Sequence, residues 1–155
     1  MKVLITDANY KHTLGAIRSL GKKGIHVIAG SFHKYAQGFY SKYTKERIIY
    51  PKSLLKWKEM TDEEIKEALY ILIKILSNIK KEKWQTENLK EKLITEAEKF
   101  GNQIKGVGDR GFLLWPFRVA LTGREMSPPP FEIAEIFGKE KTLKRINEAI
   151  KLLEQ

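Results

Sequence analysis

The sequence predicts an α+β protein in which a small parallel sheet precedes an all-helical bundle of about five helices. Two observations carry this prediction: short β-branched runs flank one helical stripe at the start of the chain, and the apolar periodicity is helical throughout after Ser53. The chain has 155 residues, 42% of them hydrophobic and 31% charged, which suits a soluble globular protein with one ordinary or two very small domains. We therefore expect an incomplete βαβ fragment over residues 1–52 and a helical domain over residues 53–155.

The first part of the chain reads as a βαβ unit followed by one more strand. Residues 2–7 (KVLITD) and 25–30 (IHVIAG) have the pattern of buried strands, and residues 8–23 between them carry a helical apolar stripe that ends at Gly24. A third strand is expected over residues 47–50, after an aromatic and basic loop. Such a unit implies parallel pairing with a right-handed crossover.

Helical signals fill the rest of the chain. Thr61 and Glu64 form a capping box that opens a helix reaching about Lys80, and Thr86 is expected to cap a second helix reaching about Phe100. The remaining expected segments are a Gly-rich, mobile connector (101–111), a short helix opened by Pro116 and ended by Gly123, a short helix from Phe131 to Phe137 ended by Gly138, and a last helix from Lys139 to Leu153.

Composition limits the kinds of site. The chain has no cysteine, and its three histidines lack metal-ligand spacing, so we expect no disulfide, no metal and no cofactor. No apolar run approaches the roughly 20 residues that span a bilayer, and the start does not resemble a secretory signal, so we expect a cytoplasmic protein that does not engage a membrane.

Charge is distributed unevenly. Residues 1–52 hold ten Lys and Arg against two acids, a net charge of +8, whereas residues 53–155 hold 19 against 17, a net charge of +2. A basic excess favours polyanion partners, although solubility alone is an equally good reading of the charge.

One stretch, Leu113 to Lys139, orders its signals in a way that composition alone would not produce. LLWPFRVALTGREMSPPPFEIAEIFGK joins an apolar turn, a basic side chain, a Gly stop and a proline elbow (Ser127–Pro130) that enters a helix. Together with LLKWKEM at Leu54 and the closing NEAIKLL, it resembles the anticodon-binding end of bacterial-type glutamyl-tRNA synthetase, a class I aminoacyl-tRNA synthetase. The resemblance covers about residues 53–155.

The resemblance implies an RNA-binding site. Carried over by position, Arg118 matches the basic residue that contacts the anticodon, and Ser127, Pro128 and Pro130 match the elbow that packs on its third nucleotide. Unstacked bases need an apolar or planar surface and a few donors, which an arginine fork, a hydroxyl and rigid prolines supply. The alternatives are that Ser127 is an ordinary helix N-cap and Arg118 a satisfied structural arginine. Further RNA contacts are expected where cations could neutralise phosphate: Arg124 and Lys139.

Two features depart from the family pattern. The family usually has Gly where Pro129 stands, and a third proline removes one backbone donor. No HIGH-like or KMSKS-like segment occurs in residues 1–155, so the expected function is tRNA binding in protein biosynthesis, at the anticodon arm of the glutamate tRNA, without the aminoacylation site. A synthetase body acting in trans is a further expected partner.

The first third of the chain resembles the Rossmann-like pre-grasp start of ATP-grasp carboxylate–amine ligases, through Thr6-Asp7-Ala8 and the Tyr40–Tyr43 loop. The ATP-binding lysine, phosphate loop and metal carboxylates of that superfamily are not present in it. Asp7 is a weak candidate for a ligand position at the end of its strand, and the alternative is that it caps the following helix. A second hypothesis is therefore an accessory ligase-like protein that binds a nucleotide or amino acid through this unit.

Overall fold

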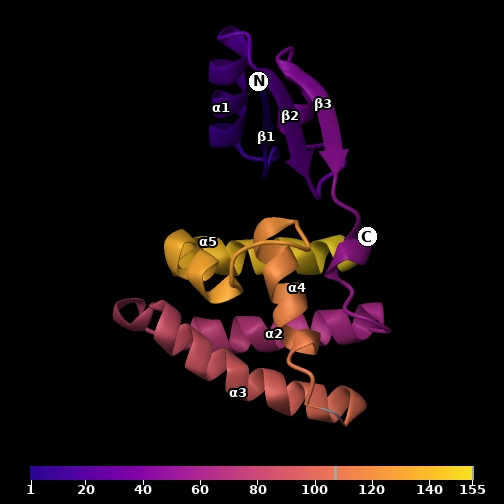
Figure 1. Ribbon diagram of the computed structural model, residues 1–155, viewed down its shortest axis with the longest axis vertical. Helices are drawn as coiled ribbons and strands as arrows, with labels where there is room; N and C mark the ends of the chain where they lie inside the picture. The colour runs from indigo at the N-terminus through magenta and orange to yellow at the C-terminus, as the bar shows by residue number, and fades with distance from the viewer. Residues whose placement is uncertain (107, 155) are drawn as a thin grey trace. The chain divides into compact units, whose positions relative to one another are not determined.

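The computed structural model describes residues 1–106 and 108–154, and the chain forms two compact units, Met1–Pro51 (unit 1) and Lys52–Gln155 (unit 2). Unit 1 contains a parallel sheet with one helix, and unit 2 is helical (Figure 1). The predicted α+β class is confirmed.

Unit 1 is a three-stranded parallel sheet in the order β1-β2-β3, with a helix over one face. Ile17 of the helix packs against Val27 and Ala29 of the central strand, and Phe39 from the following loop completes this small core. The elements are β1 (Lys2–Ile5), α1 (Lys11–Lys22), β2 (His26–Ser31), the short 3₁₀ turn η1 (Gln37–Tyr40) and β3 (Thr44–Ile49).

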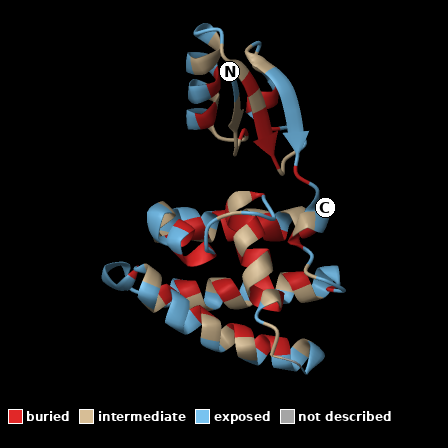
Figure 2. Cartoon of the chain, viewed as in Figure 1, coloured by how far each residue is buried: buried red, intermediate tan, exposed pale blue. Residues whose placement is uncertain are grey.

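Strand β3 begins earlier than expected, at Thr44 and not at Arg47. Thr44 pairs with Val27 across a register shift, and its hydroxyl donates to the carbonyl oxygen of Gly38 at 2.5 Å. Val27 lies in another strand and Gly38 lies outside β3, so the sequence of β3 alone did not reveal where the strand starts. The residues of β3 after Thr44 are exposed, as Figure 2 shows by its pale blue arrow.

Asp7 follows β1 in a left-handed backbone conformation, with φ of 58°. The residue at the N-cap position of α1 is Tyr10, which makes no capping hydrogen bond through its side chain. Whether Asp7 binds a ligand stays a prediction.

Unit 2 packs its helices around an apolar interior formed by Leu69 and Leu72, Leu93, Phe117 and Ile146, all fully buried. The inner faces of the helices are drawn red in Figure 2. The elements are η2 (Lys52–Leu55), α2 (Asp62–Ser77), η3 (Lys81–Lys83), α3 (Thr86–Lys105), α4 (Gly111–Thr122) and α5 (Pro130–Leu153).

Helix α2 starts where the sequence predicts. The Glu64 N–H donates to Thr61 Oγ1 at 3.2 Å, and the Thr61 N–H donates to Glu64 Oε2 at 2.6 Å, which is a complete capping box. The helix ends at Ser77, slightly before the expected Lys80. Helix α3, in contrast, starts with Thr86 as its first residue and not as its cap, because the Thr86 N–H and hydroxyl both donate to the Glu135 carboxylate.

Helix α4 is longer than predicted, and the connector before it is correspondingly shorter. α3 continues to Lys105, and α4 begins at Gly111, so Pro116 lies inside the helix and does not open it. The Asp109 carboxylate accepts the Gly111 N–H at 2.8 Å, and the Trp115 indole donates to the Leu54 carbonyl at 2.9 Å. The first bond is local and the second is tertiary, and together they hold the first turn in place, so that Pro116 falls inside the helix.

Helix α5 contains a kink at Gly138, whose φ of 74° and ψ of 166° are not helical. The two predicted helices on either side of Gly138 are therefore both present, within one continuous element. On the N-terminal side of the kink, the Ala134 carbonyl accepts from two side chains, Trp84 Nε1 at 2.8 Å and Thr142 Oγ1 at 3.3 Å.

Candidate nucleic-acid interface

The predicted RNA-contacting residues centre on the loop between α4 and α5. Gly123 ends α4 in the left-handed conformation, with φ of 68°, and its N–H donates to the Val119 carbonyl at 2.7 Å. The Thr122 hydroxyl donates to the Arg118 carbonyl at 2.8 Å and accepts the Arg124 N–H at 3.2 Å. One hydroxyl thus ties the last turn of α4 to the first residue after the Gly stop.

The proline elbow presents few donors. Pro130 is buried at the first position of α5, whereas Pro128 and Pro129 are exposed, and Pro129 is the N-cap. The Ser127 hydroxyl donates to the Pro128 carbonyl at 3.0 Å, so the alternative of Ser127 as an ordinary N-cap is wrong. Because prolines have no N–H, the first donors available at this helix start belong to Phe131 and Glu132. The elbow is therefore a rigid and mostly apolar wall.

Arg118 is half-buried on α4, about one turn before the helix ends at Thr122. Its neighbours Phe117 and Val119 are fully buried, which fixes the backbone from which its side chain projects. In the part of the chain that the structure describes, the Arg118 guanidinium makes no ion pair or hydrogen bond, so the alternative of a satisfied structural arginine finds no support. Its five donors remain available for a ligand.

Lys139 differs from Arg118. Its Nζ donates to the carbonyl oxygens of Ser77 and Ile79, both at 2.7 Å, at the C-terminal end of α2. A cation at this end of a helix satisfies orphan carbonyls and complements the helix dipole. This geometry favours a structural role for Lys139, whereas Arg124 is exposed on the loop and its contact with phosphate stays a prediction.

Two features of this region were not predicted from the sequence. Met126 lies in the same loop with 88% of its surface exposed, as a large apolar side chain between Arg124 and the proline elbow. The only indication of Met126 in the sequence is that an apolar residue stands within a polar turn. The second is Arg145, buried with its guanidinium 4.2 Å from the centroid of the Phe137 ring, where burial lowers the pKa of Arg145 to about 10.

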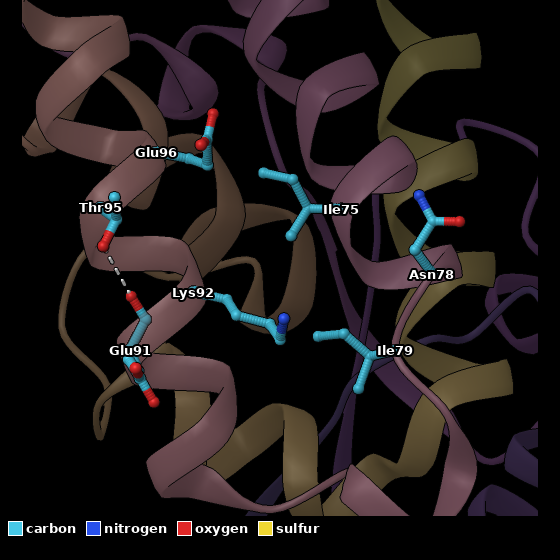
Figure 3. Close-up of a pocket in the computed structure, with 7 residues that line it drawn as sticks. All are labelled: Ile75, Asn78, Ile79, Glu91, Lys92, Thr95 and Glu96. Carbon is cyan, nitrogen blue, oxygen red and sulfur yellow. Dashed lines mark hydrogen bonds between the residues drawn. The ribbon is translucent and has the colours of Figure 1, made fainter.

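None of the predicted site residues lines the groove shown in Figure 3, a hollow of about 360 Å³ between the end of α2 and the middle of α3. Glu91, Glu96 and Lys92 supply its charged groups, with Ile75 and Ile79 as its apolar wall. The Thr95 hydroxyl donates to the Glu91 carbonyl at 3.1 Å. With two carboxylates to one ammonium, this groove does not favour an anion.

Residues 1–106 and 108–154 contain no cluster of three or more His, Cys, Asp or Glu side chains that could hold a metal ion. Among the same residues, no helix is both long and apolar enough to cross a membrane.

A helical unit in which a helix with an unpaired arginine leads into a rigid, apolar elbow has the features of an α-helical module that binds unstacked bases. Comparison with known protein families supports this class: residues 29–150 match the family described as "Anticodon binding domain". The chain belongs to this family. The match begins within β2 and extends further toward the N-terminus than the expected boundary near residue 53.

Curated relatives point to one group of enzymes. The glutamate–tRNA ligase of Clostridium kluyveri is 39% identical over 94 residues, which are 57% of this chain and 18% of that enzyme. The corresponding ligase of Clostridium acetobutylicum is 35% identical over 101 residues, which are 63% of this chain and 19% of that enzyme. The ligase of Clostridium botulinum strain Loch Maree is 42% identical over 76 residues, which are 46% of this chain and 14% of that enzyme. The chain thus spans less than a fifth of the length of each. No solved structure matches it.

These matches confirm the expectation of an anticodon-binding domain similar to the C-terminal region of glutamate–tRNA ligases, and with it the prediction of an RNA-binding module of that type. The resemblance of residues 1–51 to ATP-grasp ligases stays a prediction.

Proposed function

We propose that unit 2 binds the anticodon arm of tRNA, and specifically that of the glutamate tRNA. The observation that carries this proposal is the unpaired, half-buried Arg118 in the last turns of α4, the helix that leads into the loop with the proline elbow. In this proposal Arg118 forms a bidentate or stacked contact with one base, and the exposed Pro128 with the Pro130 turn packs against another. Ser127 contributes its hydroxyl oxygen, and Arg124 lies beside the phosphates.

Discrimination between bases would rest mainly on Arg118. A good bidentate contact discriminates by about 1–3 kcal/mol, whereas prolines give packing and no direct hydrogen-bond readout. Because Pro129 occupies the N-cap and lacks an N–H, the elbow offers one donor fewer than a glycine would there. We therefore expect measurable but incomplete selectivity among anticodons.

Aminoacylation would need a synthetase body, in the same polypeptide or in trans, since residues 1–155 carry no HIGH-like or KMSKS-like segment. Its place of action would be the cytoplasm, where tRNA is charged. The names of the matched relatives support the choice of the glutamate tRNA.

A filter-binding titration with transcripts of the glutamate tRNA and anticodon-swapped versions tests this proposal. Arg118→Ala should weaken binding of the cognate transcript about 5- to 100-fold and should reduce the preference over swapped anticodons. Arg110→Ala is the matched control, because Arg110 precedes the same helix and is already paired with Glu98. Unchanged affinity and unchanged preference in Arg118→Ala would refute the proposed role of Arg118 in reading the anticodon.

A further inference from the structure

Unit 1 holds a basic and aromatic segment that the proposed function does not use. Residues 8–45 contain seven Lys and Arg and no Asp or Glu, and unit 1 as a whole carries nine Lys and Arg against two acids, a net charge of +7. Of those two acids, Glu46 is already paired with Lys2 Nζ at 2.8 Å and His26 Nε2 at 2.6 Å. The positive charge of this unit is therefore largely uncompensated.

Two tyrosines project from this segment next to cations. Tyr35 is 76% exposed with Lys34 Nζ 5.8 Å from its ring centroid, and Tyr40 is 64% exposed with the Arg47 guanidinium 5.5 Å from its centroid. Each cation can cover only one face of its ring, so the high exposure of both rings leaves the other face open to a planar partner. Exposed aromatic faces beside positive charges are the combination by which proteins hold single-stranded nucleic acid.

The backbone that carries these tyrosines is firmly anchored. Ala36 and Phe39, which lie between Tyr35 and Tyr40, are buried in the core of unit 1. The Gly38 N–H donates to the Ala8 carbonyl at 2.7 Å. The two rings therefore project from a fixed platform, which reduces the conformational entropy that binding would cost.

We propose that this tyrosine–cation segment (Lys34–Arg47) is a second nucleic-acid-binding surface, which takes a single strand. Successive bases stack on Tyr35 and Tyr40, and the adjoining phosphates lie against Lys34 and Arg47. A membrane or an acidic protein would also be attracted by the charge, but the chemistry of the segment favours bases. Phe39 is buried, and the exposed Ile48 and Ile49 of β3 lie beyond Arg47, so the segment itself presents stacking rings with polar tips.

Filter binding of the full chain to labelled oligouridylate of about ten nucleotides tests the proposal, because this length lies within the site sizes of known single-strand binders. Tyr35→Ala and Tyr40→Ala should each weaken binding about 5-fold or more, which corresponds to about 1 kcal/mol, whereas Tyr→Phe at either position should retain it. A parallel titration with oligodeoxythymidylate distinguishes RNA from DNA as the strand; tight binding of either supports the surface.

Tyr70→Ala is the matched control, since Tyr70 is also exposed, at 53%, but lies on α2 in a patch where Glu63 and Glu67 balance the charge of Lys66 and Lys74. Its affinity for the oligonucleotide should equal that of the unaltered chain. In the titration with anticodon-swapped transcripts, Tyr35→Ala and Tyr40→Ala should leave the preference among anticodons unchanged, so failure of the anticodon proposal can be told apart from failure of this one.

Three results would overturn the proposal: no saturable binding of either oligonucleotide, full affinity in both alanine variants, or an equal loss in Tyr70→Ala. Sedimentation with vesicles of anionic and neutral lipid adds a fourth. Binding to anionic vesicles that depends on Tyr35 and Tyr40, without binding of oligonucleotide, would assign the surface to membranes.

Discussion

Replacing Lys139 by methionine should destabilise unit 2 and leave RNA binding intact. In the folded chain, Lys139 Nζ donates to the Ser77 and Ile79 carbonyls at 2.7 Å each. Methionine keeps the length and helix propensity of the side chain but removes the donors and the charge. The two carbonyls at the end of α2 then lose their partner, and only the more exposed of the two can readily turn to water.

The magnitude follows from the kind of bond. Hydrogen bonds to charged groups contribute about 1.5–3 kcal/mol each, and a cation at a helix C-terminus adds about 0.3–1 kcal/mol. Because one of the two bonds is solvent-exposed, we expect a combined loss of about 2–3 kcal/mol. In a unit of this size that loss lowers Tm by roughly 10 °C.

Urea unfolding followed by circular dichroism at 222 nm measures this change, and filter binding to the tRNA transcripts, well below Tm, measures the RNA affinity. Lys90→Met is the control, since Lys90 is exposed on α3 and has no recorded side-chain partner among the described residues; its stability should change by less than about 0.5 kcal/mol. If Lys139→Met kept its stability and lost RNA affinity, the structural assignment would be wrong and the original phosphate-binding prediction correct.

Two further predictions concern the kink within α5 and the start of α4. Gly138→Ala should destabilise unit 2 by roughly 1–2 kcal/mol in urea unfolding, because the backbone φ there is 74°. Gly15→Ala is the control: Gly15 lies within α1 with open space around it, so this substitution should be neutral or stabilising. Equal effects of the two substitutions would contradict the prediction. The pKa of Asp109 is lowered, chiefly by the hydrogen bond from Lys58, so its contribution to stability is present at neutral pH and is lost as pH falls below the ordinary value of 3.8. Asp109→Asn should therefore show a smaller drop in urea midpoint between about pH 6 and about pH 3 than the unaltered chain, and an identical drop would refute the assignment.

Local signals predicted the elements whose determinants lie within a few residues. The capping box at Thr61, the buried stripe of α2 and the interruption at Gly138 all depend on neighbours three or four positions away, and all were found as expected. The start of α4 was not, because distant partners hold it: Trp57 and Lys58 donate to the Asp109 carboxylate, and Trp115 donates to Leu54, 61 positions away.

In the candidate site, too, the sequence predicted the residues with local determinants and missed those that depend on distant contacts. Arg118 and the proline elbow could be placed from their order along the chain, since Gly123 and the prolines set that turn locally. Lys139 lies 62 and 60 positions from the carbonyls it binds, so its sequence neighbourhood gave no indication that its ammonium is occupied. The exposure of Met126 likewise depends on how α4 and α5 pack.

The division into two units has a spectroscopic consequence. All three tryptophans, Trp57, Trp84 and Trp115, belong to unit 2, whereas five of the six tyrosines belong to unit 1. Emission excited at the red edge of the indole band therefore reports on unit 2 alone. The Trp57 and Trp115 rings, 4.8 Å apart at their centroids, should also couple as an exciton pair in the near ultraviolet. The chain thus carries its own optical labels for following the two units separately as they unfold.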